Sequence, residues 1–317
     1  MKASVVAAGY ADIDIIKTIE TFPDRHGLVS IKNITKALGG AVCNCALDLA
    51  RLSPETAVKP MAMYGNDEYG AYMHAQLEKQ PNIDMSLMIR QGTTGFTDVL
   101  DEADTRVRTF LVYRGANSQF DVESVDVDAL DSFDETYGTR MARLLHKVRA
   151  AGIMTSVDAI TDSTGRHRDL MPAAMKYADV MCVNEHEAGA AFGMELRRKD
   201  GALDLDGMEK ALRLFRENGV AKWAVIHAPE CAMGIDENDQ PVFVPGVKLP
   251  EGFIKGTVGA GDAFVSGLLL GARDGRSLSD AIEDGIAAAV TSLSEAGASE
   301  GVRPLSEARA LLETLRG

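Results

Sequence analysis

The chain has 317 residues, of which 46% are hydrophobic, and its formal net charge at pH 7 is −14. A chain of this length buries enough apolar surface for one large α/β domain or two smaller ones. Because its acidic surface repels nucleic acid and anionic membranes, we expect neither as a partner. No apolar run approaches the roughly 18 residues that cross a bilayer. Asp12 and Asp14 also interrupt the N-terminal apolar stretch, so no signal peptide is expected there.

The cysteines predict no disulfide framework. The chain contains Cys43, Cys45, Cys182 and Cys231. Four cysteines in so long a chain are typical of a protein with reduced thiols, and the predicted localisation is cytoplasmic. Two of them stand two residues apart on a predicted helix and therefore point in different directions. We interpret these two as small core residues and not as metal ligands.

Strands and helices alternate through the first part of the sequence. In chain order, the pattern predicts a strand at 3–9, a helix at 39–52, a strand at 58–65 and a helix at 68–80. Two segments do not follow this alternation. Residues 12–36 have a strand-like pattern, and residues 95–113 have two β-like halves around the polar turn EADTR, which predicts a hairpin.

The alternation continues through the second part. The pattern predicts a helix at 137–152, a strand at 153–159, a helix at 170–178, a strand and helix at 179–193, a helix at 205–220 and a strand at 222–228. From residue 256 the pattern is mostly helical. Strands that alternate with helices in this way indicate a parallel sheet covered by helices on both faces.

The stretch KGTVGAGDAF, residues 255–264, combines three glycines with an aspartate at the start of a predicted helix. The glycines leave backbone N–H groups uncovered, and these groups together with the helix dipole form an anion site. Asp262 falls in the first helical turn, where an acid is equally well explained by its favourable interaction with the dipole. The spacing matches neither a P-loop nor the dinucleotide-binding pattern.

Several motifs resemble those of one family. GTVGAGDAF resembles the C-terminal signature of the ribokinase-like (PfkB) sugar and nucleoside kinases. Five further segments resemble family motifs and occur in the family's order: GYADID (9–14), GGAVCN (39–44), GNDEYG (65–70), RGAN (114–117) and VNEHEA (183–188). The resemblance covers about residues 5 to 302. It implies a three-layer α/β/α sandwich with a mainly parallel central sheet and a small β-lid.

The resemblance also implies a division of the chain. Residues 1–11, 37–92 and 116–317 would form the main α/β domain, which binds nucleotide and substrate. Residues 12–36 and 93–115 would form the lid, which closes over the sugar and excludes water. Lids of this family often carry the dimer contact, so a homodimer through the lid is expected.

The implied activity is the transfer of the γ-phosphoryl group of ATP to a primary hydroxyl of a small sugar or polyol. Asp262 would take the hydroxyl proton, and the N–H groups of Gly259, Ala260 and Gly261 would stabilise the transferred group. The resemblance assigns Mg²⁺ to Glu187 and Asn184, with water between protein and metal. Asn184 and Glu187 also have the spacing of a capping box at a helix start, and the two interpretations are compatible.

The resemblance places further residues at the two substrates. For the sugar these are Asp12, Asp14, Gly39, Gly40, Asn44, Arg114 and Asn117, and for the nucleotide they are Asn184, His227, Thr257, Gly259 and Gly261. Two carboxylates two residues apart on a strand share one side and accept hydrogen bonds from hydroxyl groups. Arg114 either binds an anionic group of a substrate or is a solvated surface residue.

Two positions depart from the family pattern. Gly256 stands where many members have an aspartate that contributes to a monovalent-cation site, so activation by K⁺ is not expected. HAPECA, residues 227–232, stands where the family has a T-x-G-x-x-G segment, and Pro229 removes a backbone N–H there. His227 either donates to a phosphate or ends the strand without a role. The alternatives to a sugar kinase are a nucleoside kinase and a catalytically silent sugar-binding protein.

Overall fold

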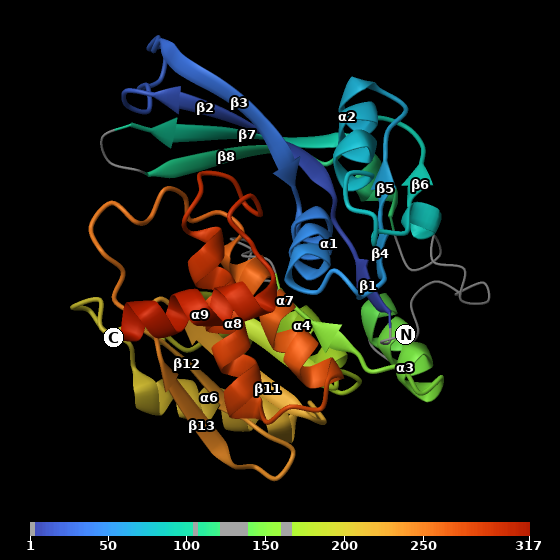
Figure 1. The fold of residues 1–317 in the computed structure, drawn as a ribbon, viewed down its shortest axis with the longest axis vertical. Helices are drawn as coiled ribbons and strands as arrows, with labels where there is room; N and C mark the ends of the chain where they lie inside the picture. The colour runs from blue at the N-terminus through green and yellow to red at the C-terminus, as the bar shows by residue number, and fades with distance from the viewer. Residues whose placement is uncertain (1–3, 104–106, 121–138, 160–166) are drawn as a thin grey trace. The chain divides into compact units, whose positions relative to one another are not determined.

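The chain folds into two compact units, and each draws on separate parts of the sequence. The computed structural model describes residues 4–103, 107–120, 139–159 and 167–317. Unit 1 comprises Met1–Asp121, Pro250–Ser266 and Ala288–Ala310, and unit 2 comprises Val122–Leu249, Gly267–Ala287 and Leu311–Gly317. Figure 1 labels the helices and strands of both units.

Unit 1 contains a four-stranded sheet formed by the two segments that were expected to make the lid. In spatial order its strands are β3 (Ile31–Gly39), β2 (Asp12–Ile19), β7 (Gly95–Glu102) and β8 (Arg108–Tyr113) (Figure 1). β2 runs parallel to β7 and antiparallel to β3, and β7 and β8 form the predicted hairpin. Residues 104–106 of its turn lie outside the described residues. The boundary between lid and main domain stays a prediction.

The rest of unit 1 contains two pairs of short strands and helices, two of which pack against this sheet. β1 (Val5–Ala8) runs parallel to β4 (Val58–Met61), β5 (Met63–Tyr64) pairs with β6 (Ile89–Arg90), and the helices are α1 (Ala41–Leu52), α2 (Glu68–Leu77), η1 (Met85–Leu87) and η2 (Gly115–Gln119). The strand predicted at 58–65 is thus two short strands. The core joins both helices to the sheet and includes Ile13, Leu38, Val42, Leu47, Met73 and Leu77.

The GNDEYG motif joins α2 to the beginning of β7. The carboxylate of Asp67 caps α2 by accepting from the N–H of Gly70 at 2.9 Å, and it accepts from the N–H of Thr94 at 2.8 Å. A Cβ atom at Gly65 would lie 2.2 Å from the nitrogen of Thr94, so a side chain has no room there. This motif therefore has a structural explanation, which fixes where β7 begins.

Unit 2 is built on a five-stranded mixed sheet. Its strands, in order, are β13 (Pro241–Pro245), β12 (Cys231–Ile235), β11 (Trp223–Ala228), β10 (Val180–Asn184) and β9 (Ser156–Val157). β9, β10 and β11 are parallel, as predicted, whereas β12 and β13 are antiparallel. The expectation of a mainly parallel sheet therefore needs correction in this unit. β12 and β13 each follow the preceding strand after a short turn. Such a turn reverses the direction of the chain, so each pairs antiparallel with its neighbour.

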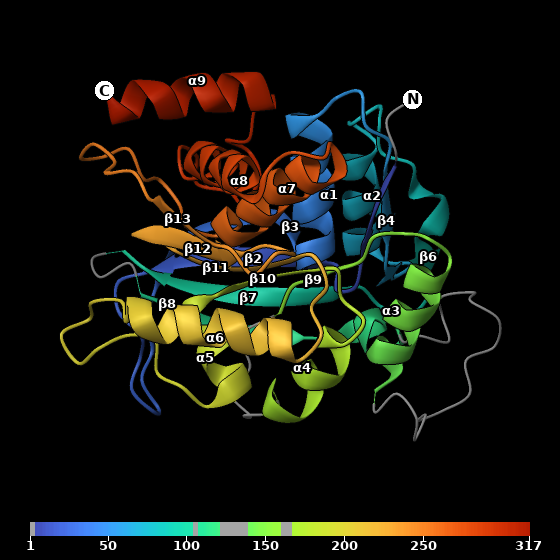
Figure 2. The ribbon, with the colours of Figure 1, turned by 90° about the horizontal axis from the view of Figure 1, so that it is seen from below.

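Helices cover both faces of this sheet. The helices numbered before α7 in this unit are α3 (Arg140–Ala150), α4 (His167–Met175), α5 (Glu185–Phe192) and α6 (Leu205–Glu217). α6 packs on β11 and β12, and α8 (Leu278–Ser292) lies against the opposite face, as Figure 2 shows. A Cβ atom at Gly234 of β12 would lie 3.0 Å from Leu278 and 3.2 Å from Ile282, so the missing side chain lets α8 approach closely.

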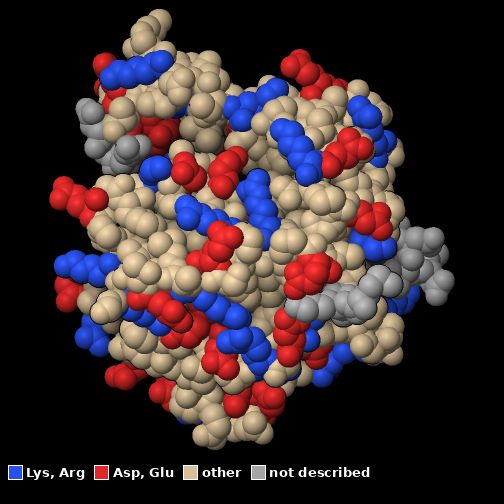
Figure 3. Space-filling view, in the orientation of Figure 1, with Lys and Arg blue, Asp and Glu red and all other residues tan. Residues whose placement is uncertain are grey.

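The C-terminal region is mostly helical, as predicted, with α7 (Ala260–Arg273), α8 and α9 (Leu305–Arg316). Among the described residues, no helix is long and apolar enough to cross a membrane. Acidic and basic side chains are interspersed on the face shown in Figure 3.

Candidate active site

The glycine stretch forms a turn that leads directly into α7. Gly259 has φ +78°, a backbone conformation that side chains disfavour, and a Cβ atom there would lie 2.5 Å from the carbonyl oxygen of Ala298. The first N–H groups of a helix have no partner within it, so the turn from Gly259 to Gly261 presents donors and the positive end of the dipole. Thr257, just before this turn, is exposed.

Gly256 is buried against the segment that follows α8. A Cβ atom at this position would lie 2.4 Å from the carbonyl oxygen of Ala296. The aspartate found at this position in many relatives of the motif therefore does not fit here unless the backbone shifts.

Asp262 lies in the first turn of α7 and contacts α1. Asn44 Nδ2 donates to Asp262 Oδ2 at 2.9 Å, and Cys45 Sγ lies 3.9 Å from Asp262 Oδ1. The prediction that both cysteines of α1 are core residues holds for Cys43, which is fully buried. It is wrong for Cys45, which is only half-buried and faces the aspartate, because residues two apart on a helix point in different directions.

Two further carboxylates lie at the beginning of β2. A Cβ atom at Gly39 would lie 2.5 Å from Asp12 Oδ1 and 2.6 Å from Asp14 Oδ1, so both carboxylates crowd around this glycine. Thr97 Oγ1 donates to Asp12 Oδ2 at 2.7 Å. Burial and the charge of Asp12 raise the pKa of Asp14 to about 7, with the charge of Arg108 opposing and that of Asp262 adding to the rise. Burial likewise raises the pKa of Asp12.

Tyr10, which the motifs did not indicate, belongs to the same region. Its hydroxyl is buried without a hydrogen-bond partner among the described residues. Burial and the charge of Asp12 raise the pKa of Tyr10 to about 12, and the charge of Arg114 opposes this rise. Arg114 itself is exposed where η2 begins. Tyr10 lies within the motif GYADID, but the sequence analysis considered only the two aspartates of that motif.

Gly40 and Asn117 hold the backbone near these carboxylates. Gly40 has φ +80°, and a Cβ atom there would lie 2.6 Å from the carbonyl oxygen of Tyr10. The amide of Asn117 bonds the backbone of Ala11 in both directions, at 3.0 Å to its N–H and 2.7 Å to its carbonyl oxygen. These contacts explain why both residues occur in motifs, and a direct contact with substrate stays a prediction for each.

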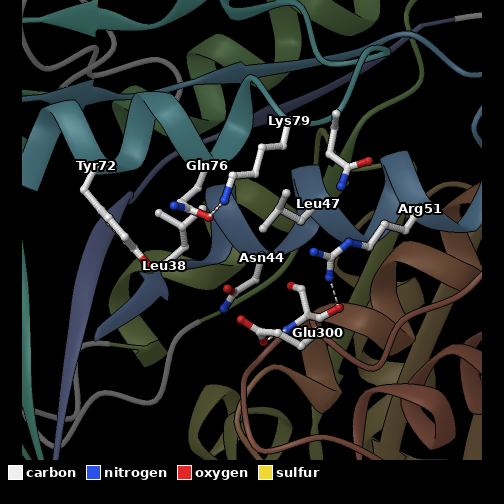
Figure 4. A pocket seen from close by; sticks show the side chains of 10 residues that line it. Leu38, Asn44, Leu47, Arg51, Tyr72, Gln76, Lys79 and Glu300 are labelled. Carbon is white, nitrogen blue, oxygen red and sulfur yellow. Dashed lines mark hydrogen bonds between the residues drawn. The ribbon is translucent and has the colours of Figure 1, made fainter. Parts of the chain in front are cut away.

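A pocket adjoins this region of unit 1 (Figure 4). Its lining comes from β3, α1, α2 with the residues that follow it, and the segment after α8. The lining residues are Leu38, Asn44, Leu47, Arg51, Tyr72, Gln76, Lys79, Gln80, Ser299 and Glu300. Arg51 donates to the backbone oxygen of Ser299, and Lys79 Nζ donates to Gln76 Oε1 at 2.7 Å. Of these residues the motifs indicated only Asn44, which connects the pocket to Asp262.

Asp48 is a buried acid on the same helix. Its exposed fraction is 0%, and neither carboxylate oxygen has a hydrogen-bond partner among the described residues. Burial raises the pKa of Asp48 well above its usual range. Ser299 and Arg51 oppose this rise, and the charge of Asp262 adds to it. The sequence carried a signal, since one acid interrupts the apolar run CALDLARL.

Unit 2 carries Asn184, Glu187 and His227, three of the residues that were expected at the nucleotide and metal. Asn184 caps α5 by accepting from the N–H of Glu187 at 2.9 Å, and Glu187 Oε2 accepts from the N–H of Asn184 at 3.1 Å. His227 of β11 pairs with Asn184 of β10 in register. Burial lowers the pKa of His227 to about 4, with the charge of Glu185 opposing, so the imidazole is neutral at pH 7.

Asn184 and Glu187 suit a metal ion that is held through water better than one that the protein coordinates directly. Among the described residues, no three His, Cys, Asp or Glu side chains are grouped so that they would hold a metal ion together. Mg²⁺ keeps several waters and needs one or two carboxylates. Glu187 Oε2 accepts one hydrogen bond, from the N–H of Asn184. A carboxylate has capacity for further bonds, so Glu187 can also accept from the water ligands of a metal ion.

Comparison with known proteins identifies the family. The model of the pfkB family carbohydrate kinases matches residues 2–304. The chain belongs to this family. It is therefore a phosphotransferase with a sugar or nucleoside hydroxyl as acceptor, as the motifs predicted. A 5-dehydro-2-deoxygluconokinase of Geobacillus kaustophilus is 24% identical over 89% of this chain and 86% of its own. A fructokinase of Vibrio alginolyticus is 26% identical over 84% of this chain and 82% of its own.

Solved ribokinases share the fold. A ribokinase of Arabidopsis thaliana, complexed with ribose and ATP, has a TM-score of 0.78 at 18% identity and covers 99% of both chains. A ribokinase of Giardia lamblia has a TM-score of 0.80 at 17% identity, covering 98% of this chain and 100% of its own. The predicted ribokinase-like α/β class is thereby confirmed.

We predict that Asp48→Asn stabilises the protein at neutral pH by roughly 1 to 3 kcal/mol. The amide has nearly the same shape, and it removes a carboxylate whose burial outweighs the opposing effects of Ser299 and Arg51. The folded state holds the proton more tightly, so wild-type stability falls as pH rises above the unfolded pKa of about 3.9. The advantage of the variant should therefore shrink as pH falls toward that value. Urea unfolding across pH measures it, and a less stable variant at neutral pH would contradict the prediction.

Proposed function

We propose that this chain is an ATP-dependent sugar kinase that phosphorylates a primary hydroxyl of a small sugar or polyol. The observation that carries the proposal is the position of Asp262. It lies in the first turn of a helix that directly follows a glycine with positive φ, and it accepts a hydrogen bond from Asn44. A base beside uncovered N–H groups is the equipment that phosphoryl transfer requires.

Asp262 acts as the base in this proposal. Its carboxylate takes the proton of the acceptor hydroxyl while the hydroxyl oxygen attacks the γ-phosphorus. Asn44 donates to one carboxylate oxygen, which orients the group. The N–H groups of Gly259, Ala260 and Gly261 stabilise the negative charge on the transferred phosphoryl group, because the donors are in place before the reaction.

The acceptor binds at the carboxylates of Asp12 and Asp14. Both lie beside Gly39, where the missing side chain leaves room for their oxygens. Ionised carboxylates accept hydrogen bonds from sugar hydroxyls, which supports a polyol as the ligand. We assign to Arg114 an anionic group of a substrate, since the guanidinium is exposed in a strongly acidic protein.

ATP and Mg²⁺ are assigned to the residues that the motifs indicated for them. Asn184 and Glu187 would hold the hydrated metal ion, while His227 and Thr257 would contact the nucleotide. When bound, the metal ion neutralises charge on the phosphates. No aspartate fits at position 256, so we expect turnover without added K⁺.

The nucleoside-kinase alternative has one supporting observation. Phe110 pairs with Val99, and both lie on the same side of the sheet as Asp12 and Asp14. Phe110 is 54% exposed. An exposed ring on this face suits the stacking of a base. A panel of sugars and nucleosides separates the two activities, and the absence of all turnover would instead favour a silent binding protein.

We predict that Asp262→Asn lowers kcat by roughly 10² to 10⁴, the usual contribution of a positioned base. The substitution keeps the shape of the side chain and an oxygen that can accept from Asn44, so thermal stability should stay near that of wild type. Steady-state kinetics with the best acceptor of the panel measures the loss. Wild-type turnover in the variant would remove Asp262 from the chemistry.

We predict that kcat/KM for the acceptor rises as pH increases through about 7. This parameter reports the free enzyme, in which the pKa of Asp14 is raised to about 7 by burial and the charge of Asp12. Deprotonation then gives a carboxylate that accepts from two hydroxyls. A pH profile measures the rise. Asp14→Asn should flatten it, and an unchanged profile in that variant would assign the titration to another group.

We further propose a homodimer through the lid. β8 is an edge strand, and Phe110, Leu111, Val112 and Tyr113 are each 48–55% exposed. An exposed apolar edge favours a second copy. Light scattering should give a dimer for wild type and a monomer for Leu111→Lys. Phe243→Lys, at a similarly exposed site on β13, should remain dimeric. A monomeric wild type would exclude this interface.

A further inference from the structure

The segment HAPECA, which departs from the family pattern, is bound by an arginine that no motif indicated. Arg197 lies between α5 and α6, where its backbone forms an isolated antiparallel β-bridge with that of Leu203. Its Nη1 donates to Glu230 Oε1 at 2.8 Å, and its Nη2 donates to Glu230 Oε2 at 3.1 Å. This is the two-pronged geometry that makes an arginine–carboxylate pair strong. Glu230 belongs to the turn between β11 and β12.

The same guanidinium binds a second carboxylate. Arg197 Nε donates to Glu185 Oε1 at 2.7 Å, and Nη2 lies 2.6 Å from the same oxygen. The side chain of Glu185 is almost fully buried, with 6% exposed, whereas that of Arg197 is 25% exposed. A buried carboxylate is costly unless it is paired, so this contact is needed where α5 begins. Arg197 Nη1 also donates to the carbonyl oxygen of Gly201 at 2.9 Å.

These two carboxylates lie next to the proposed nucleotide residues. Glu185 directly follows Asn184, and Glu230 lies three residues after His227. Asn184 and His227 are partners in the parallel pair of β10 and β11, so both strands end at the same edge of the sheet. Arg197 therefore ties together the two chain segments that leave this edge.

The pairing also sets the charge at this edge. Glu185, Glu230 and Arg197 together carry one net negative charge. Without Arg197, Glu230 would lose its bidentate partner and Glu185 would retain His186 Nε2 at 3.5 Å. Like charges repel the phosphates of a nucleotide, and the repulsion is strong where one carboxylate is buried.

We propose that Arg197 is a positioning residue of the nucleotide site. It offsets one of the two negative charges of Glu185 and Glu230 and holds the strand ends that present Asn184 and His227. The HAPECA turn replaces a glycine-rich segment, and the bond from Glu230 to Arg197 fixes the turn that glycines would otherwise shape. This inference rests on the proposed function, because it assigns the nucleotide to this edge of unit 2.

The test separates KM for ATP from the other kinetic parameters. Arg197→Met should raise KM for ATP by at least about fivefold, because both carboxylates lose the cation that they share. KM for the acceptor should change less than about twofold, because the acceptor contacts unit 1. Arg197→Lys, which keeps the charge but loses the fork, should lie between wild type and Arg197→Met. Equal KM values for ATP in all three proteins would overturn the proposal.

A double variant distinguishes charge neutralisation from general loss of structure. Adding Glu230→Gln to Arg197→Met should recover part of the affinity for ATP, because one uncompensated carboxylate disappears. A purely structural role predicts no recovery, and that result would also overturn the proposal. Arg213→Met is the matched control, because Arg213 forms a 2.6 Å pair with Glu209 on the exposed face of α6 in the same unit. It should leave both KM values unchanged.

Calorimetry with a non-hydrolysable ATP analogue and Mg²⁺ provides a readout that does not need turnover. If wild type binds the analogue but phosphorylates no acceptor, the proposed function fails and Arg197→Met should still bind at least about fivefold more weakly. If wild type and Arg197→Met bind the analogue equally, the role of Arg197 is refuted whatever the activity.

Discussion

The crowding of three carboxylates in unit 1 is the constraint on which the candidate site depends. Asp12 and Asp262 repel Asp14, and burial penalises the charged forms of Asp12 and Asp14, so the surrounding residues must compensate. Thr97 donates to the first and Asn44 to the third, while the charge of Arg108 acts on the second. The raised pKa of Asp14 is what remains after this compensation. A polyol with several hydroxyl donors would complete it, which explains why the same arrangement is both costly in the free protein and suited to its proposed ligand.

Structural and functional roles coincide in unit 2. Asn184 and Glu187 form a capping box that starts α5, and the same two residues are the proposed support of a hydrated metal ion. A helix start needs acceptors for its free N–H groups, and a metal site needs oxygen ligands held in place. One pair of side chains can meet both needs because capping uses only part of its bonding capacity. Arg197 extends this arrangement to the next strand end by pairing with Glu185 and Glu230.

Sequence reasoning succeeded where a motif is local. The hairpin of β7 and β8, the start of α7 at the glycine turn and the capping box all follow from neighbouring residues and their periodicity. It failed for β12 and β13, because their short apolar runs lie between proline and polar turn residues and resemble loops. Residues of the site that stand alone in the sequence were also missed. Tyr10 and Cys45 carry no periodic signal, and only their neighbours in space relate them to the carboxylates.

The sequence by itself determined the family, the alternation of strands and helices, and the residue types of the site, because each is carried by short segments with their own spacing. Only the tertiary structure decided which side chains meet. The contact between Asn44 and Asp262 spans 218 positions, and the pairing of Arg197 with Glu230 spans 33. It also decided that position 256 has no room for a carboxylate, because the carbonyl oxygen of Ala296 occupies that space. Such contacts depend on the path of the backbone between the partners, which the identity of the residues alone does not specify.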